Sequence, residues 1–570
     1  MVMERLEKKK ISGHEYYYYA GWGWKDGRCR RLWQRYLGKL EDIVKAVEGG
    51  GPQPAYAEVF EFGLTEALWR EAERIGVIET IDELCPKRQQ GLSVGQYLAV
   101  AAANRAAEPV SKRAMWEWFS ATSLLRHVAG ATREALSSQR FWDHMKRVTE
   151  QKSRDIWRHL LGKLYERGQL NLADISYDGT NFYTFINTFN VRSRLARRGK
   201  NKQGRSNLRQ VSYALFCTRD GGIPLFYDVY EGNANDARQF PVMCRRFVQF
   251  IAEVTGNRPD ERSTTLIFDK GNNSRENIRL LDELKFQFIG SVKLDEHRDL
   301  AEISNADERF TACQSPELTG IMAFETQKVI YGKSRRVAVA WNQELFDNQW
   351  RTLQNDIDKA LIALSELRRR LDDRAQGLIR GGRAPTEESV TKQCNEIRSR
   401  QYLKQIISVE VTAREKAPHL SYGTDTEALK RLADTRMGKK LIVTNDTTRT
   451  LEELIIAYHS QYVIEDLFKE MKDRKTGCWW PLNHWTDSQI RVHGLYCTVA
   501  ALLRTLTLRQ LRRAGMKLSM RRMLKELSDI REVVNVFPAK RRRRQRSQAV
   551  LSKTNEVQRR MLKILDIQAD

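Results

Sequence analysis

The sequence predicts an α/β fold in which a core of strands and helices is interrupted by a large insertion and preceded by a helical region. Two strand-like runs that end near an aspartate, QLNLADISYDG and TTLIFD, indicate the first part of the core. A helical segment with a central glutamate, YHSQYVIEDLFKEMKD, indicates its second part, and it begins far downstream. The distance between these motifs is what predicts the insertion.

The chain is strongly basic. Its 570 residues include 97 Lys and Arg against 72 Asp and Glu, which gives a formal net charge of +25 at pH 7. Such a surplus is typical of a protein that binds a polyanion, and nucleic acid is the natural candidate. No stretch reaches about 18 uninterrupted apolar residues, and no apolar h-region follows the N-terminus. We therefore expect a cytoplasmic protein with no membrane partner.

The N-terminal part of the chain predicts a hairpin followed by helices. HEYYYYAGWGW and RCRRLWQRYLG flank a turn at Asp26-Gly27, which indicates a basic β-hairpin. EGGGPQP then marks a linker. In the helical pattern that follows, Ser93 is positioned to cap one helix and Ser111 a second, just after Pro109. The pair resembles a helix-turn-helix, but simple packing of two short helices explains it equally well.

A regular order of strands and helices begins near residue 169. Asp174 and Asp178 share one face of the first strand, and Asp178 falls where that strand is expected to end. A hairpin and a helix follow, and then TTLIF, which ends at Asp269 before a helix whose Asn273 and Glu276 have capping-box spacing. A last strand, FQFIGSVK, completes the order expected of a ribonuclease H-like fold. That fold brings the two acidic strand ends side by side.

An inserted domain is expected after these strands, because 196 positions separate Asp269 from Glu465. WRTLQNDIDKALIALSELRRRLDD has helical spacing, and GLIRGGRAP separates it from a second helix near residues 387–403. We expect a helical hairpin on a partly β insertion. KKLIVTND returns the chain to the core, and Thr450 with Glu453 forms a capping box before the helices that lead to Glu465.

One helical segment groups four polar side chains. Tyr458, Gln461, Glu465 and Lys472 follow one another at steps of three, four and seven residues, which return to the same face of a helix. A carboxylate flanked by a phenol, an amide and an ammonium suits a site that holds a metal ion beside an anionic ligand. Alone, Glu465 would more simply be a solvated partner of Lys469. Its combination with two strand-end acids favours a functional site.

These motifs together resemble a DDE transposase of a bacterial insertion sequence, in the group with a Tyr-Arg-Glu-Lys signature. Gln461 stands where that signature has arginine, and further matching pieces are YDGTNFY, GGIPLFYDVYEGNANDARQF, LIFDKGNN and NHWTDSQIRVHG. The resemblance implies that Asp178, Asp269 and Glu465 hold two Mg²⁺ ions, with Mn²⁺ able to substitute. It also implies cleavage by water, transfer of the released 3′-hydroxyl to target DNA, and a homodimer that joins two ends. The YDGT context favours Asp178 over its rival, Asp174.

The implied partner is double-stranded DNA, as terminal inverted repeats and as target. Tyr458, Gln461 and Lys472 would hold the terminal strand beside the metal ions. A separate basic run is most simply an arm that contacts phosphates without reading bases, and it consists of Lys540, Arg541, Arg542, Arg543 and Arg544. Because glutamine brings no charge, a catalytically decayed transposase that acts as a DNA-binding regulator is the alternative function. A nuclease of the same fold that cuts without joining is a second alternative.

The expected regions follow from these motifs. They are an N-terminal basic β-hairpin with a short helix (1–50), a helical DNA-binding region (55–168), the first part of the core (169–293), the insertion (294–440), the second part of the core (441–535) and a basic C-terminal tail (536–570).

Overall fold

The computed structural model describes most of the chain. The described residues are 2–25, 27–48, 53–87, 91–199, 204–205, 207–256, 264–479, 482–538 and 546–568. The basic run 540–544 and Asp26 of the predicted hairpin turn therefore lie outside the described residues. The chain divides into two compact units. The smaller unit comprises residues 1–70, 113–134 and 510–570, and the larger unit comprises residues 71–112 and 135–509.

The smaller unit begins with a three-stranded antiparallel sheet in the order β1-β2-β3. Its strands are β1 (Met3–Ile11), β2 (His14–Lys25) and β3 (Arg28–Gly38), and the helix α1 (Leu40–Glu48) follows. The pairing of β2 with β3 confirms the predicted hairpin, and β1 adds a strand that the sequence analysis did not predict. A Cβ atom on Gly21 would lie 2.4 Å from the Trp33 ring. Glycine at this position therefore allows the indole to lie flat against β2.

The rest of the smaller unit combines a second sheet with helices. β17 (Arg531–Val536) pairs with both β4 (Tyr56–Glu61) and β18 (Ser547–Leu551). The helices are α5 (Met115–Ser120), α18 (Met520–Ser528) and α19 (Glu556–Ile564), whereas α2 (Gly63–Arg74) and α17 (Asp487–Arg513) each belong partly to both units. Ser111 directly precedes the helical segment that it was predicted to cap. A 3₁₀ turn over Lys112–Ala114 comes first, and α5 begins only at Met115.

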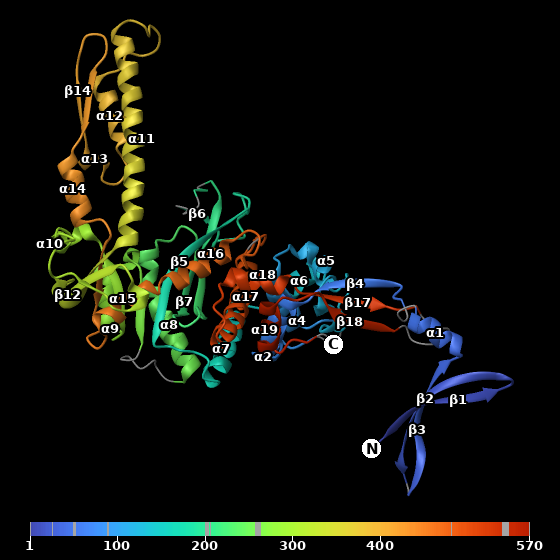
Figure 1. The fold of residues 1–570 in the computed structure, drawn as a ribbon. Helices are drawn as coiled ribbons and strands as arrows, with labels where there is room; N and C mark the ends of the chain where they lie inside the picture. The colour runs from blue at the N-terminus through green and yellow to red at the C-terminus, as the bar shows by residue number, and fades with distance from the viewer. Residues whose placement is uncertain are drawn as a thin grey trace. The chain divides into compact units, whose positions relative to one another are not determined.

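A large mixed sheet forms the centre of the larger unit (Figure 1). In the described residues it has ten strands: β5 (Asp174–Thr184), β6 (Arg197–Arg198), β7 (Arg209–Thr218), β8 (Pro224–Glu231), β9 (Thr265–Phe268), β10 (Gln287–Val292), β11 (Thr311–Ala312), β12 (Ile321–Ile330), β13 (Lys333–Asn342) and β16 (Lys439–Thr444). The order is β11-β12-β13-β16-β10-β9-β5-β7-β6, and β8 also pairs with β7. The pairs β5-β9 and β9-β10 are parallel, and the other pairs are antiparallel.

The sequence analysis placed the end of the first core strand too early. β5 does not stop at Asp178 but continues to Thr184, because β7 pairs with it along this whole length, up to Thr184 opposite Arg209. The parallel pairing with β9 is shorter and ends where Tyr177 lies opposite Phe268. Asp178 therefore marks the point where one of the two neighbouring strands ends, rather than the end of its own strand.

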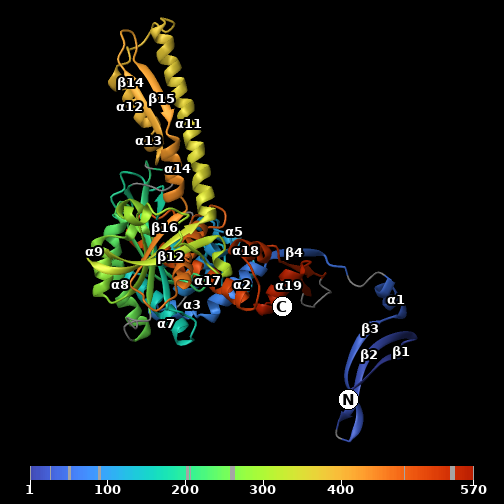
Figure 2. The same cartoon turned by 60° about the vertical axis from the view of Figure 1, so that its left-hand side comes forward.

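The region expected as an insertion has two parts in the structure. Its first strands, β11 to β13, extend the large sheet beside β16 and so do not form a separate domain. The remainder forms an arm, which Figures 1 and 2 show in yellow and orange. The arm consists of α11 (Gln343–Ala375), α12 (Glu387–Ile397), α13 (Leu403–Ile406), the hairpin of β14 (Ile407–Thr412) and β15 (His419–Thr424), and α14 (Thr426–Thr435). Its own apolar core includes Ile357, Leu364, Val390 and Leu420.

Further helices complete the larger unit. They are α3 (Val77–Leu84), α4 (Val94–Ala107), α6 (Ser138–Met145), α7 (Glu150–Glu166), α8 (Asp236–Thr255), α9 (Arg275–Glu283), α10 (Arg298–Ala301), α15 (Leu451–His459) and α16 (Tyr462–Lys472). The predicted capping boxes at Ser93 and Thr450 are confirmed. The cap predicted at Asn273 was wrong: Ser274 caps α9, because the Asn273 amide donates to the Ser291 carbonyl instead.

Two further expectations bear on partners. All side chains of α4 from Val94 to Ala106, except that of Gln96, are buried, so α4 packs inside the unit. Among the residues that the structure describes, no helix combines the length and apolar character needed to cross a membrane.

Candidate active site

Two aspartates lie at neighbouring positions on adjacent parallel strands. The last parallel pair of β5 and β9 is Tyr177 with Phe268, so the next residues along the chain are Asp178, within β5, and Asp269, directly after β9. Neighbouring strands lie about 4.8 Å apart. Both aspartates are half-buried, and each accepts a hydrogen bond at Oδ1 from the following backbone N–H, of Gly179 or Lys270, at 2.7 Å. The strand order thus brings the two predicted acids together.

The two carboxylates also point to the same face of the sheet. Tyr177 and Phe268 both contact the Phe240 ring on α8, with ring centroids 5.0 and 5.1 Å from it. Because side chains alternate along a strand, Asp178 and Asp269 project to the opposite face. α15 and α16 cover that face. The Tyr458 hydroxyl of α15 donates to Ser291 Oγ on β10 at 2.9 Å.

Glu465 lies on α16, on the same side of the sheet as the two aspartates. α16 turns Ile464, Leu467 and Met471 towards the core and leaves Glu465 exposed. Near its end, Lys472 Nζ donates a hydrogen bond to Thr180 Oγ1, two residues beyond Asp178 on β5. α16 is therefore anchored beside the strand that carries the first aspartate.

Electrostatic effects connect Asp269 with Glu465. Burial raises the pKa of Tyr458 to about 12, the hydrogen bond to Ser291 opposes this shift, and the charges of Asp269 and Glu465 add to it. Burial lowers the pKa of Lys440 on β16, and the same two carboxylates oppose that shift. Both acids therefore lie within electrostatic reach of one phenol and one ammonium. Sequence reasoning missed Lys440, whose only signal was a cation inside the apolar strand KKLIVT.

The donor atoms of these residues suit a hard cation, but three ligands do not converge on one point among the described residues. Carboxylate oxygens are the donors that Mg²⁺ prefers, and Asp178 and Asp269 offer them from adjacent strands. Across the described part of the chain, however, no three His, Cys, Asp or Glu side chains converge into a group that could hold a metal ion. The site is thus a neighbouring pair of carboxylates, with Glu465 exposed on the helix beside it.

The predicted single helix is in fact two. α15 ends at His459 and α16 begins at Tyr462. The Ser460 hydroxyl donates to the Ala457 carbonyl at 2.6 Å, and Gln461 N–H donates to the Tyr458 carbonyl at 3.2 Å in a 3₁₀-type bond. A serine that bonds the preceding turn competes with the regular helical ladder, which explains the division.

The four side chains grouped by the sequence differ in exposure. Tyr458 and Gln461 are each only 6% exposed. Lys472 is half-buried, and Glu465 is exposed. The Tyr458 hydroxyl donates a hydrogen bond to Ser291 within the unit. Glu465 and Lys472 are therefore the more exposed members of the group.

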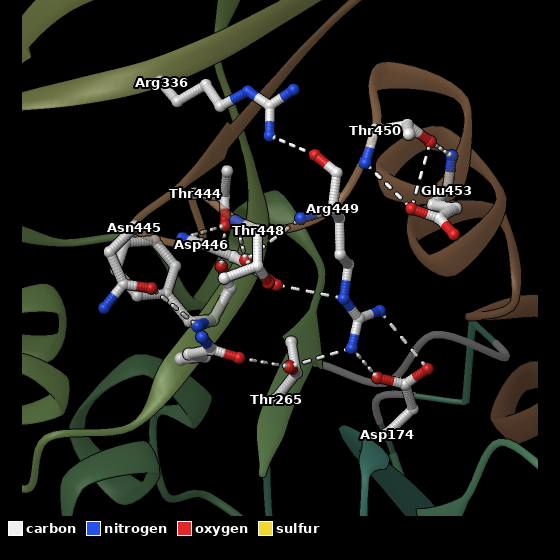
Figure 3. Close-up of polar contacts among 12 residues, drawn as sticks. Asp174, Thr265, Arg336, Thr444, Asn445, Asp446, Thr448, Arg449, Thr450 and Glu453 are labelled. Carbon is white, nitrogen blue, oxygen red and sulfur yellow. Dashed lines mark hydrogen bonds and ion pairs between the residues drawn. The ribbon is translucent and has the colours of Figure 1, made fainter. Parts of the chain in front are cut away.

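Asp174, the rival first acid, belongs to a different arrangement (Figure 3). Arg449 donates to its carboxylate at 2.5 and 3.3 Å. Arg219 also donates to it, at 3.0 Å. Arg449 also donates to Thr265 Oγ1 at 3.1 Å and pairs with Asp446 at 2.9 Å. Asp174 thus pairs with cations at the start of β5.

Comparison with known proteins gives the class of the chain. The family described as "Transposase DDE domain" matches residues 174–497, more than half of the chain and a range that contains both aspartates and Glu465. The chain belongs to this family, and this membership supports a transposase function.

The chain is also similar to a solved structure titled "Cryo-EM structure of piggyBac transposase synaptic complex with hairpin DNA". The identity is 8% and the TM-score 0.36, over 81% of this chain and 79% of that chain. No curated protein matches the chain.

Proposed function

We propose that the chain is a DDE transposase that binds the ends of its own mobile element, cleaves DNA there and transfers the new 3′-hydroxyl to target DNA. One observation carries the proposal: Asp178 and Asp269 lie at neighbouring positions and share the face of the sheet on which α16 presents Glu465. Membership of the transposase DDE family supports it, because the family match contains all three acids.

The three acids are the proposed metal ligands. Asp178, Asp269 and Glu465 would hold two Mg²⁺ ions, with Mn²⁺ able to substitute. The bound ions would neutralise the phosphodiester and assist an in-line displacement. The exposed position of Glu465 leaves its side chain free of the packing that fixes Tyr458.

Lys472 is the proposed phosphate contact beside the acids. Its ammonium donates to Thr180 Oγ1, and this bond holds the side chain over β5. Tyr458 acts instead as a positioning residue, because its hydroxyl joins α15 to β10 through Ser291. Gln461 is buried, so it acts within the protein and not on the DNA surface.

The proposed organisation follows the strand order. β8, β7, β5, β9 and β10, with α15 and α16, would form a ribonuclease H-like core, and the arm from α11 to α14 would be the main insertion. The proposed partners are double-stranded DNA, as terminal inverted repeats and as target, and a second copy of the chain. Lys540 to Arg544 would contact phosphates. The element would be a bacterial insertion sequence, and the protein would act in the cytoplasm.

The burial of Gln461 bears on the alternative of a decayed, regulatory copy. A buried arginine without a carboxylate partner is unfavourable, whereas a neutral amide is tolerated there. Glutamine in place of the signature arginine is therefore compatible with an active enzyme, and activity decides between the two functions.

The test is cleavage and joining on a duplex that carries the inverted repeat flanking the coding sequence. We expect Mg²⁺-dependent cleavage and strand transfer by the wild type. The variants Asp178→Asn, Asp269→Asn and Glu465→Gln should lose both reactions yet still bind the duplex. Asp466→Asn is the matched control, because Asp466 is the exposed neighbour of Glu465 and pairs with Lys469 on the same helix. Binding without cleavage by the wild type would instead indicate a regulator, and cleavage without joining would indicate a nuclease.

A further inference from the structure

The connection between β5 and β6 presents large apolar side chains to the solvent. Phe185, Phe189 and Val191 are 64%, 88% and 91% exposed. Apolar residues that are exposed singly need no explanation, but three within seven residues form a patch that a partner would normally cover.

The patch rests on a well-anchored loop. Ile186, Leu195 and Ala196 of the same connection are buried, with exposures of 6%, 5% and 0%. The loop therefore has an inner side that packs against the unit and an outer side that displays Phe189 and Val191.

Asp487, at the start of α17, holds the second half of the loop. Its carboxylate accepts hydrogen bonds from Ser193 Oγ at 2.8 Å, from Arg194 N–H at 2.9 Å and from Leu195 N–H at 3.1 Å. Three donors on one carboxylate fix this backbone, so the outward display of Val191 is a property of the fold.

The first half of the loop is held by two further residues. Arg209 on β7 donates to the Asn190 carbonyl at 2.8 Å and also to the Thr188 carbonyl. The Asn190 side chain donates to the Trp485 carbonyl at 3.2 Å, and the Trp485 side chain is itself 61% exposed. Phe189 lies between these two anchored positions.

The charge around the loop identifies its partner. Between Asp178 and Asp220 the sequence has nine Lys and Arg and no Asp or Glu. The four arginines inside the loop are all exposed: Arg192, Arg194, Arg197 and Arg198. An apolar patch within a loop that carries four exposed arginines fits a polyanion with apolar faces between its charges, which describes DNA, better than a neutral or basic protein surface.

The loop is continuous with the candidate active site. Along β5, Lys472 contacts Thr180, and Arg474 donates to the Tyr183 hydroxyl at 3.1 Å. The Arg205 guanidinium lies 4.9 Å from the centroid of the same Tyr183 ring. Phe185 follows Asp178 by seven residues, about 23 Å along an extended strand. That length is within one turn of a DNA duplex, about 34 Å.

We infer that residues 185–198 form a DNA wedge, which inserts Phe189 and Val191 between base pairs of the bound transposon end. The inference rests on the proposed function for the identity of the DNA. Apolar side chains inserted at a base step unstack it and bend the duplex. The flanking arginines hold phosphates on either side. The hydrogen bonds to Asp487 and from Arg209 keep the loop in place when the duplex is bent. The wedge thereby distorts DNA near the scissile phosphate.

The experiment measures unstacking directly, without cleavage. Duplexes of the inverted repeat carry 2-aminopurine at successive positions across the last turn, about 10 base pairs. Full-length protein is added at saturation in the presence of a chelator, and fluorescence is recorded. The variants are Phe189→Ser and Val191→Ser. Val329→Ser is the matched control, because Val329 on β12 is an equally apolar side chain that is 68% exposed.

We expect a several-fold rise in fluorescence at one or two adjacent positions with the wild type and with Val329→Ser. The rise should be lost with Phe189→Ser and Val191→Ser while the duplex remains bound. Phe189→Trp should restore it. An unchanged rise in the serine variants, or no rise at any position with the wild type, overturns the wedge. If the serine variants instead lose self-association in the absence of DNA and keep the rise, the loop is a protein interface and the wedge is overturned.

The same series separates this inference from the proposed function. A fluorescence rise that depends on Phe189, in a protein that never cleaves, supports the wedge while catalysis fails. Normal cleavage of fully paired ends by the serine variants, with an unchanged fluorescence rise, overturns the wedge while the transposase activity stands.

Discussion

Lys472 on α16 donates a hydrogen bond to Thr180 on β5, and Thr180 shares a strand face with Asp178 two residues earlier. The two residues are 292 positions apart in the sequence. This bond connects the helix that carries Glu465 to the strand that carries the first aspartate. It also holds the ammonium on the face of β5 that carries Asp178.

Replacing Lys472 should therefore impair catalysis more than binding. A hydrogen bond to a charged group contributes about 1.5–3 kcal/mol, so Lys472→Ala should slow end cleavage by roughly 10- to 100-fold. Rates at saturating DNA would measure this effect. Lys469→Ala is the control on the same helix, because Lys469 pairs with Asp466 in solvent. Equal effects of the two substitutions would contradict a specific phosphate contact by Lys472.

Tyr458 should behave as a structural residue. Tyr458→Phe removes the donor to Ser291 and should destabilise the protein by about 1 kcal/mol, with little change in affinity for the DNA end. Thermal unfolding and a binding titration would measure the two quantities. Tyr462→Phe is the control, because Tyr462 on α16 is 61% exposed. Weaker DNA binding at unchanged stability would mean that Tyr458 contacts DNA after all.

Local patterns predicted the parts of the fold that depend on neighbouring residues. The run of strands and helices from β5 to β10 and the capping boxes at Ser93 and Thr450 were readable because period and cap spacing are local signals. The neighbouring positions of Asp178 and Asp269 also followed from the predicted strand order.

Contacts between segments that are far apart in the chain could not be predicted from the sequence. The true end of β5 depends on β7, and β11 to β13 join the large sheet through β16, about a hundred residues later. The pair of Asp174 with Arg449, 275 positions apart, had no local signal either. The division between α15 and α16 did have one, the Ser460 hydroxyl, but helical periodicity alone does not reveal it.

Lys440 should weaken metal binding at the candidate site. Its ammonium acts on Asp269 and Glu465, and one unit charge near metal ligands repels a cation. Lys440→Met should therefore lower the Mg²⁺ concentration for half-maximal cleavage by about 2- to 5-fold. Lys440→Arg keeps the charge and should leave this concentration unchanged. If the Met variant instead requires a higher DNA concentration for half-maximal cleavage, at an unchanged Mg²⁺ requirement, Lys440 contacts the duplex.

Asp446 should make the stability of the larger unit sensitive to acid. Burial raises the pKa of its carboxyl, but hydrogen bonds from Thr448 and the charge of Arg449 outweigh this, so its pKa lies below the ordinary value. A group with a lowered pKa in the folded state stabilises the protein above its unfolded pKa, near 4, and this contribution is lost as pH falls through the folded value.

Asp446→Asn should therefore be less stable than the wild type at pH 7 and should lose less stability between about pH 5 and pH 3. Thermal unfolding across that interval would measure both effects. Asp347→Asn is the control, because Asp347 on α11 only accepts a hydrogen bond from Gln343 on the exposed side of its own helix. If the wild type and Asp446→Asn lose the same stability on acidification, the pairing of Asp446 with Arg449 contributes nothing to the pH dependence, and the stabilising charge lies elsewhere in the unit.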